Sequence, residues 1–100
     1  METFDEYGFI QDLNDFLTNE INNGNNTDIQ TLINEYIDSE CIYYADCWAI
    51  CYELHANNFD SFDMECKTIT DLAYCALWEL VNEKLNISKL EILYEKKFNQ

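Results

Sequence analysis

Proline is absent from this sequence of 100 residues, and glycine occurs only twice, at Gly8 and Gly24. A chain without proline has no residue that interrupts a helix by lacking an amide hydrogen. Two isolated glycines also exclude the glycine-rich loops that bind phosphates or dinucleotides. These absences favour a mostly helical chain without a nucleotide-binding loop.

Long apolar runs are also missing. No stretch approaches the ~18 apolar residues of a membrane span, and the chain begins with acids where a secretory signal needs bases. We therefore expect a soluble protein of the cytoplasm with no membrane partner. In that reducing compartment the five cysteines are expected to be small buried side chains rather than disulfides. The length supports one domain, residues 1–100.

Basic residues are scarce and unevenly placed. Arginine is absent, and all five lysines follow position 66. Residues 1–66 contain fifteen acids and no base, whereas residues 67–100 contain five of each, so the net charge of −15 belongs to the first two thirds. So many uncompensated acids repel one another and destabilise the compact state, and far fewer would keep the protein soluble. It complements a basic groove, and large basic grooves in cells bind DNA or RNA.

Apolar spacing predicts helices over residues 3–22, 28–39, 41–54, 70–85 and 89–98. The asparagine and glycine run at residues 22–26 is predicted to end the first helix. Capping-box patterns at Thr27 with Gln30 and at Ser88 with Glu91 are predicted to begin the second and the last. Residues 57–66 are expected to form a loop or a short irregular strand.

The segment Cys41 to Leu54, CIYYADCWAICYEL, is apolar around almost its whole circumference. Such a helix is usually covered by neighbours on all sides. We therefore predict an all-α, single-domain bundle of four to five helices around a buried central helix, 41–54. Its predicted packing residues are Tyr43, Tyr44, Cys47, Trp48, Ile50 and Cys51.

The same segment contains candidates for chemistry. Cys47, Cys51 and His55 share one helical face, and Cys66 would complete a zinc ligand set, but the close ligand pairs of structural zinc sites are missing. A Cys51 nucleophile with His55 as base has no accompanying oxyanion loop. Asp60, Asp63 and Glu65 lack the glycine and the spacing of a calcium loop. We predict no catalytic residues, no metal, no cofactor and no enzymatic activity.

The acids remain as candidates for a binding surface. Acids three or four positions apart on a helix, such as Asp12 and Asp15, lie about 5–6 Å from each other. Successive phosphates of a nucleic acid are similarly spaced, so rows of acids can imitate a phosphate backbone; the alternative is a merely solvated face. The predicted partner-binding acidic surface comprises Asp5, Asp12, Asp15, Glu20, Asp28, Glu35, Asp38, Asp46, Glu53, Asp60, Asp63 and Glu65.

The stretch CIYYADCWAIC at residues 41–51, followed by LAYCALWELVNEKL at 72–85, resembles small phage and mobile-element proteins. In these a Tyr-Tyr-x-Asp-x-Trp helix precedes an Ala-Tyr-x-x-Leu-Trp/Tyr-Glu helix. In size and acidity the chain is also similar to phage-encoded anti-CRISPR and anti-restriction inhibitors, several classes of which mimic DNA.

This resemblance implies a stoichiometric inhibitor whose partner is a host defence protein or ribonucleoprotein with a basic groove. No catalytic residue carries over from it. Direct nucleic-acid binding is not expected of so acidic a chain, and a homodimer is left open. The alternative function is a non-enzymatic adaptor or regulator of phage or host machinery, anchored by an exposed aromatic such as Phe59, Phe62 or Trp78.

Overall fold

The computed structural model describes residues 4–54 and 68–99 of the chain. These residues form five helices and no strand: α1 (Glu6–Asn22), α2 (Ile29–Glu40), α3 (Tyr44–Glu53), α4 (Ile69–Lys84) and α5 (Ile87–Phe98). The predicted all-α fold is confirmed. The segment predicted as a loop or strand, 57–66, lies outside the described residues.

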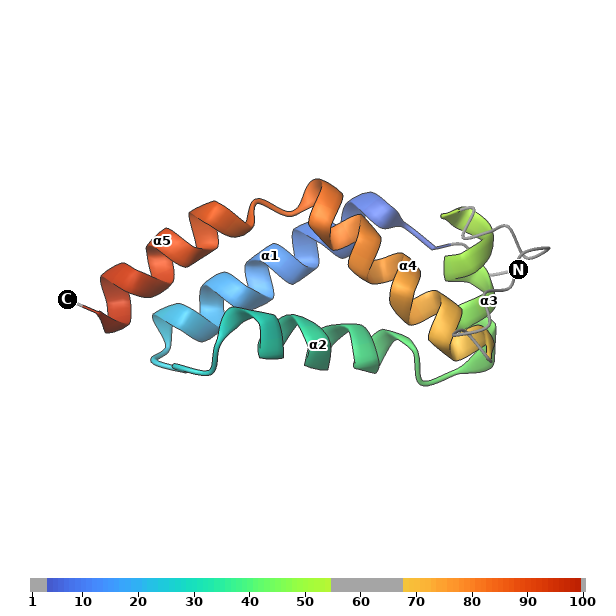
Figure 1. The fold of residues 1–100 in the computed structure, drawn as a ribbon, viewed down its shortest axis with the longest axis horizontal. Coiled ribbons are helices and arrows are strands. Elements are labelled where there is room, and N and C mark those ends of the chain that lie inside the picture. Colours follow the sequence, from blue (N-terminus) through green and yellow to red (C-terminus); the bar gives the residue numbers. More distant parts are fainter. Residues whose placement is uncertain (1–3, 55–67, 100) are drawn as a thin grey trace.

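Helix α1 is in contact with α2, α4 and α5, whereas α3 packs against α4. Figure 1 shows α2 returning antiparallel to α1, α3 standing at one end of the molecule, and α5 at the other. From the α3 end, α4 runs back across α1 and α2, and α5 continues beside α1. The molecule is elongated as a result, with extents of 49 × 28 × 21 Å.

The core forms because three helices each carry an apolar face at helical spacing. On α1 the buried side chains recur every four residues, and three of them are 0% exposed: Leu13, Leu17 and Ile21. Facing residues on α2 and α4 supply most of the rest of the core: Ile29, Leu32, Ile33, Ile37, Ile69, Ala73, Ala76, Leu77, Leu80 and Val81. The core therefore lies mainly between α1, α2 and α4.

The prediction of a buried central helix at 41–54 is wrong. The helix is shorter, α3 stands at the end of the bundle, and it packs mainly against α4. Among the predicted packing residues Cys47, Ile50 and Cys51 are buried, but Tyr43, Tyr44 and Trp48 are 69%, 66% and 54% exposed. Apolar residues around a whole helix allow it to be buried on every side. Whether it is buried depends on how many neighbouring helices pack against it.

Helix starts also differ from the predicted capping boxes. α2 is capped by Asp28 rather than Thr27, because the Asp28 side chain accepts the backbone N–H of Thr31. α5 begins earlier than predicted, because the Asn86 side chain accepts the N–H of Lys89 at 3.1 Å. In both helices the side chain of a nearby Asp or Asn is the N-cap, in place of the Thr or Ser of the box pattern.

The predicted end of α1 is confirmed. Gly24 has a φ of 90°, in the left-handed region that side chains disfavour. Its N–H donates to the carbonyl of Ile21, and the next N–H, from Asn25, donates to Glu20. This pair of bonds is a Schellman motif, which turns the chain into α2.

Candidate functional site

The structure describes nine of the twelve acids predicted to bind a partner, and Asp60, Asp63 and Glu65 lie outside the described residues. Two of the nine also stabilise helix starts: the Asp5 carboxylate accepts the N–H of Gly8 at 3.1 Å, and Asp28 caps α2. Glu20 accepts a hydrogen bond from the Asn25 side chain at 2.9 Å. These local contacts leave the negative charges in place.

Three of the predicted acids meet at a single hollow on the surface. Asp5 and Asp12 come from the start of α1, Asp46 comes from α3, and Glu40 joins them from the last turn of α2. We call this site the acidic hollow, defined by Asp5, Asp12, Glu40 and Asp46. The hollow measures about 300 Å³, and no described residue that lines it is basic. It lies at the end of the molecule where α1 begins and α2 ends (Figure 1).

Aromatic rings line the same hollow. Phe4, Phe9 and Tyr36 contribute to its wall, and Phe9 is buried. The ring centroids of Phe4 and Phe9 are 5.6 Å apart, and those of Phe9 and Tyr36 are 5.7 Å apart. These tilted pairs are favourable aromatic packing, so the rings form a fixed apolar surface beside the carboxylates.

The environment of the hollow raises the pKa of Glu40. Burial raises the pKa of its carboxyl group, and the nearby charges of Asp46 and Asp12 raise it further. Tyr36 follows the same trend: burial raises the pKa of its phenol, with smaller contributions from Glu40 and Asp12. Negative charge is therefore disfavoured in the hollow of the free protein, and a cation placed there would relieve it.

The sequence prediction missed Glu40. It lies only six positions from Asp46 but on a different helix, and the turn of the chain between α2 and α3 brings both carboxylates to one hollow (Figure 1). Counting every acid of residues 1–66 would have included it. The remaining predicted acids Asp15, Glu35, Asp38 and Glu53 are exposed and do not line the hollow.

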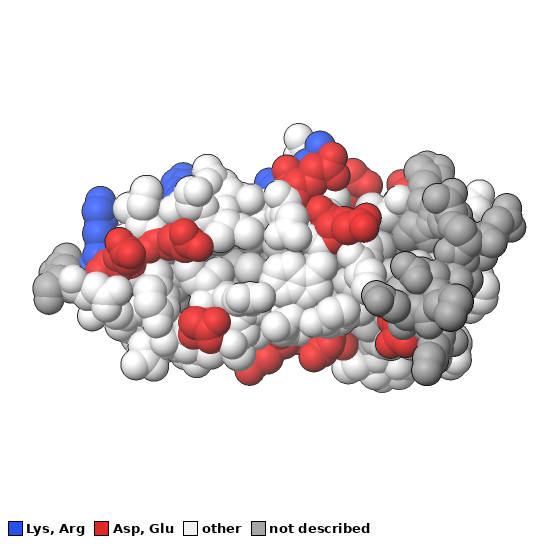
Figure 2. All heavy atoms as spheres, in the orientation of Figure 1, with Lys and Arg blue, Asp and Glu red and all other residues white. Residues whose placement is uncertain are grey.

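Charge is distributed along the long axis of the molecule. The lysines that the structure describes lie at the end of α4 and on α5: Lys84, Lys89, Lys96 and Lys97. Figure 2 shows the blue atoms along the α5 side of this face, with acids in separate groups around an uncharged centre. The acidic hollow and the lysines of α5 thus lie toward opposite ends.

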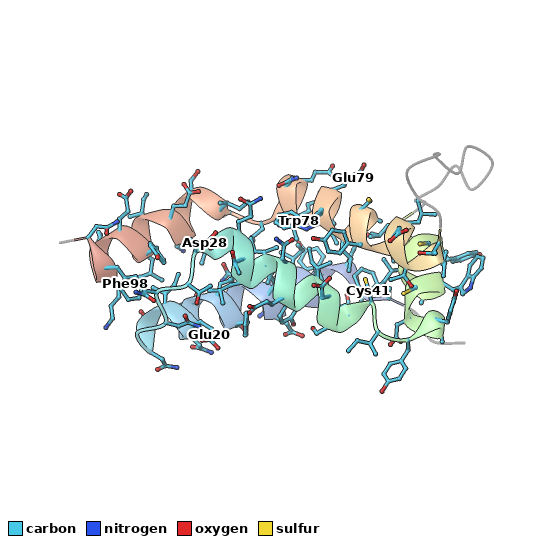
Figure 3. The ribbon with its side chains drawn as sticks, turned by 60° about the horizontal axis from the view of Figure 1, so that its bottom comes forward. Glu20, Asp28, Cys41, Trp78, Glu79 and Phe98 are labelled. Carbon is cyan, nitrogen blue, oxygen red and sulfur yellow. The ribbon has the colours of Figure 1, made fainter. Side chains whose placement is uncertain are left out.

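Trp78, a predicted exposed anchor, is instead used inside the fold. It is half-buried against the core, and its indole N–H donates to the side-chain oxygen of Asn34 on α2 at 2.9 Å. Figure 3 shows Trp78 on the part of α4 beside α2. The other two predicted anchors, Phe59 and Phe62, lie outside the described residues.

The cysteine candidates for zinc or catalysis are buried. Cys47 and Cys51 are 0% exposed, and their thiols lie 3.8 Å from the Thr70 hydroxyl and 3.9 Å from the Ile69 carbonyl oxygen. Burial, with neighbouring Cys47, raises the pKa of the Cys41 thiol to about 12. His55 and Cys66 lie outside the described residues. Residues 4–54 and 68–99 hold no group of three His, Cys, Asp or Glu arranged for a metal ion.

Comparison of the chain with protein families, curated proteins and solved structures finds no match. Within the described ranges, no helix has both the length and the apolar character that crossing a membrane requires.

Proposed function

We propose that this protein is a phage-encoded, stoichiometric inhibitor of a host nucleic-acid-targeting defence complex, of the anti-CRISPR or anti-restriction kind. It acts without catalysis, by binding a basic cleft with its acidic surface. One observation carries the proposal: four carboxylates from three helices surround one hollow that no described base neutralises. Because the target is a host complex, the protein works in the host cytoplasm.

The acidic hollow matches the chemistry of lysine and arginine side chains. Its volume of about 300 Å³ accommodates such a side chain, and its carboxylates supply acceptors for an ammonium or guanidinium group. The rings of Phe4, Phe9 and Tyr36 offer apolar and cation–π contact to the methylene stem and the charged head.

The raised pKa of Glu40 supports the same function. A site whose acids repel one another gains more from a bound cation than a single exposed acid does, because binding also relieves the repulsion. Keeping Asp12, Glu40 and Asp46 together lowers the stability of the free protein. A structural role alone gives no reason for this arrangement.

Acids elsewhere on the surface serve the approach to the target. Residues 1–66 contain no base, so the charged side chains that α1, α2 and α3 themselves present to a partner are all negative. Such a field increases association rates with a basic cleft and repels nucleic acid, which would compete for that cleft.

The second candidate function is a non-enzymatic adaptor or regulator bound through exposed aromatic residues. The observation in its favour is the exposure of Tyr43, Tyr44 and Tyr52, at 69%, 66% and 67%. In that case the acids only solubilise the chain, and neutralising them leaves partner binding unchanged.

Plaque formation tests the proposal. A sensitive phage is plated on strains that carry different RNA-guided or restriction defence systems, with and without this protein. We expect rescue against at least one system. Rescue should be lost in Asp12→Asn/Glu40→Gln, which neutralises two acids of the hollow on α1 and α2.

The matched control is Asp15→Asn/Glu35→Gln, which removes the same charge from the same two helices outside the hollow. It should retain rescue. Absence of rescue by the wild-type protein against every system, with expression verified, contradicts the inhibitor function. Retained rescue in both variants favours the adaptor.

A further inference from the structure

Large apolar side chains are exposed mainly at one place on the described surface. Of the seven large hydrophobic residues found exposed, five lie between positions 42 and 52, among them Tyr44, Trp48 and Tyr52. The other two are Tyr7 on α1 and Ile92 on α5. Scattered exposed hydrophobics need no explanation, whereas a concentration of them marks an interaction surface.

Three of these side chains form one row. Tyr44, Trp48 and Tyr52 follow one another at intervals of four along α3, so they share a helical face. We call them the aromatic stripe. They are 66%, 54% and 67% exposed, although Trp48 also interacts with a neighbouring group. Tyrosine and tryptophan are the residue types that most often dominate binding energy at interfaces.

The outer side of α3 separates the aromatic stripe from the acidic hollow. At about 100° per residue, Trp48 and Asp46 lie on opposite flanks of the helix, with small Ala45 and Ala49 between them. Ala49 and Asp46 line the hollow. A partner seated on the outer side of α3 therefore contacts the stripe on one flank and the hollow on the other, and the alanines permit close approach.

The negative charge around α3 indicates which kind of partner can bind this surface. No base occurs in residues 1–66, so α1, α2 and α3 bring only acids to this end of the molecule. A second copy docked by the same surface would place acids against acids, and nucleic acid would be repelled in the same way. A basic protein surface with an apolar cleft beside its cations is complementary on both flanks.

We infer that the aromatic stripe and the acidic hollow form one docking surface for a basic protein that carries an apolar cleft next to its lysines or arginines. The inference rests on the proposed function, because it adds an apolar anchor to the same charged interface. Charge brings the partner to the surface, and the buried aromatic rings then slow its dissociation.

Two peptide probes of equal charge test the inference on the full-length protein. One is octa-lysine, and the other is an amphipathic helix-forming peptide with eight lysines on one face and leucines on the other. Titration calorimetry should show the leucine-bearing peptide binding at least about tenfold more tightly, which corresponds to roughly 1.4 kcal/mol. The difference should persist at high salt, which weakens only the charged part of the contact.

Variants then locate the contact. Tyr44→Ser/Trp48→Ala/Tyr52→Ser should remove the tenfold preference and leave octa-lysine binding unchanged. Tyr7→Ser/Ile92→Ala, which removes exposed apolar side chains from α1 and α5, should retain the preference. Circular dichroism verifies that each variant is folded, as expected because the substituted side chains are largely exposed.

Three outcomes overturn the inference: equal binding of the two peptides, a preference that survives in the stripe variant, or a dimer in sedimentation that the stripe variant abolishes. A separate result, in octa-lysine binding by the charge variants, would contradict the proposed function. In that case Asp12→Asn/Glu40→Gln binds octa-lysine as tightly as Asp15→Asn/Glu35→Gln does, whatever the leucine peptide shows.

Discussion

Asn34 on α2 accepts the indole N–H of Trp78 on α4 at 2.9 Å, and the same amide oxygen accepts the hydroxyl of Tyr74 at 2.5 Å. One side-chain oxygen thus joins two helices that lie far apart in the sequence. Both donors are partly buried, so each would lose its partner if this oxygen were removed.

We therefore expect Asn34→Leu to lower the free energy of unfolding by about 1–3 kcal/mol. Asn34→Asp retains the acceptor and should lose less. Asn82→Ala, an exposed change on α4, is the control and should remain within about 0.5 kcal/mol of wild type. Urea denaturation measures all three, and equal stabilities for Asn34→Leu and the control would show that the contact between α2 and α4 does not depend on Asn34.

Gly24 provides a test of the connection between α1 and α2. Its φ of 90° is unfavourable for any residue with a β-carbon, although open space surrounds the position. Gly24→Ala should therefore destabilise the protein by about 1 kcal/mol through backbone strain alone. Asn23→Ala, at the preceding position with a φ of −84°, should have little effect. Thermal unfolding of the pair checks this, and two equal midpoints would contradict the Schellman geometry.

Glu40→Gln should stabilise the free protein at neutral pH. The substitution removes one charge from a partly desolvated site where Asp46 and Asp12 repel it, and we expect a gain of about 0.5 kcal/mol. Glu35→Gln, an exposed acid on the same helix, is the control and should give no comparable gain. A loss of stability in Glu40→Gln would mean that the carboxylate holds a stabilising contact instead.

The raised pKa of Glu40 also predicts how stability changes with pH. The folded state binds a proton at Glu40 more readily than the unfolded state, so this contribution is present at low pH and is lost as pH rises through the folded pKa. Lowering the pH from neutral toward about 5 should thus stabilise wild type more than Glu40→Gln. The measurement is the free energy of unfolding of both proteins over this range, and parallel curves would exclude a role for Glu40.

The buried thiols predict slow alkylation of the native protein. Cys41, Cys47 and Cys51 are buried, and the raised pKa of Cys41, about 12, leaves almost no thiolate there at pH 8. We expect iodoacetamide to modify these three residues about 100-fold more slowly than in urea, as followed by peptide mass spectrometry. Rapid labelling of Cys51 in the folded protein would contradict its burial and restore the hypothesis of a thiol nucleophile.

Much of the helical content could be predicted from the sequence. The repeat of Leu13, Leu17 and Ile21 specifies one buried face of α1, and Gly24 marks where that helix ends. Such signals are local: a period of 3.6 and a residue tolerant of positive φ act within a few positions. The helix boundaries missed by one to three residues reflect competition between adjacent caps, as at Thr27 and Asp28.

The position of α3 and the composition of the site could not be predicted in the same way. Periodicity reports which side chains are apolar, but Trp48 and Tyr44 are exposed because α3 packs mainly on a single neighbour. The convergence of Asp12, Glu40 and Asp46 depends on how α1, α2 and α3 pack and on the turn between α2 and α3, which local spacing does not encode. The uneven charge locates the acids in the first two thirds of the sequence, but it does not indicate which of them meet in the acidic hollow.

The most direct test of the central claim is a titration of octa-arginine into the protein at NaCl concentrations from about 50 to about 500 mM. We predict that affinity for wild type falls steeply with salt, and that Asp12→Asn/Glu40→Gln binds more weakly and with a shallower salt dependence than the equally charged Asp15→Asn/Glu35→Gln. Affinity that is independent of salt, or identical in the two variants, would contradict the claim that the acidic hollow binds basic side chains.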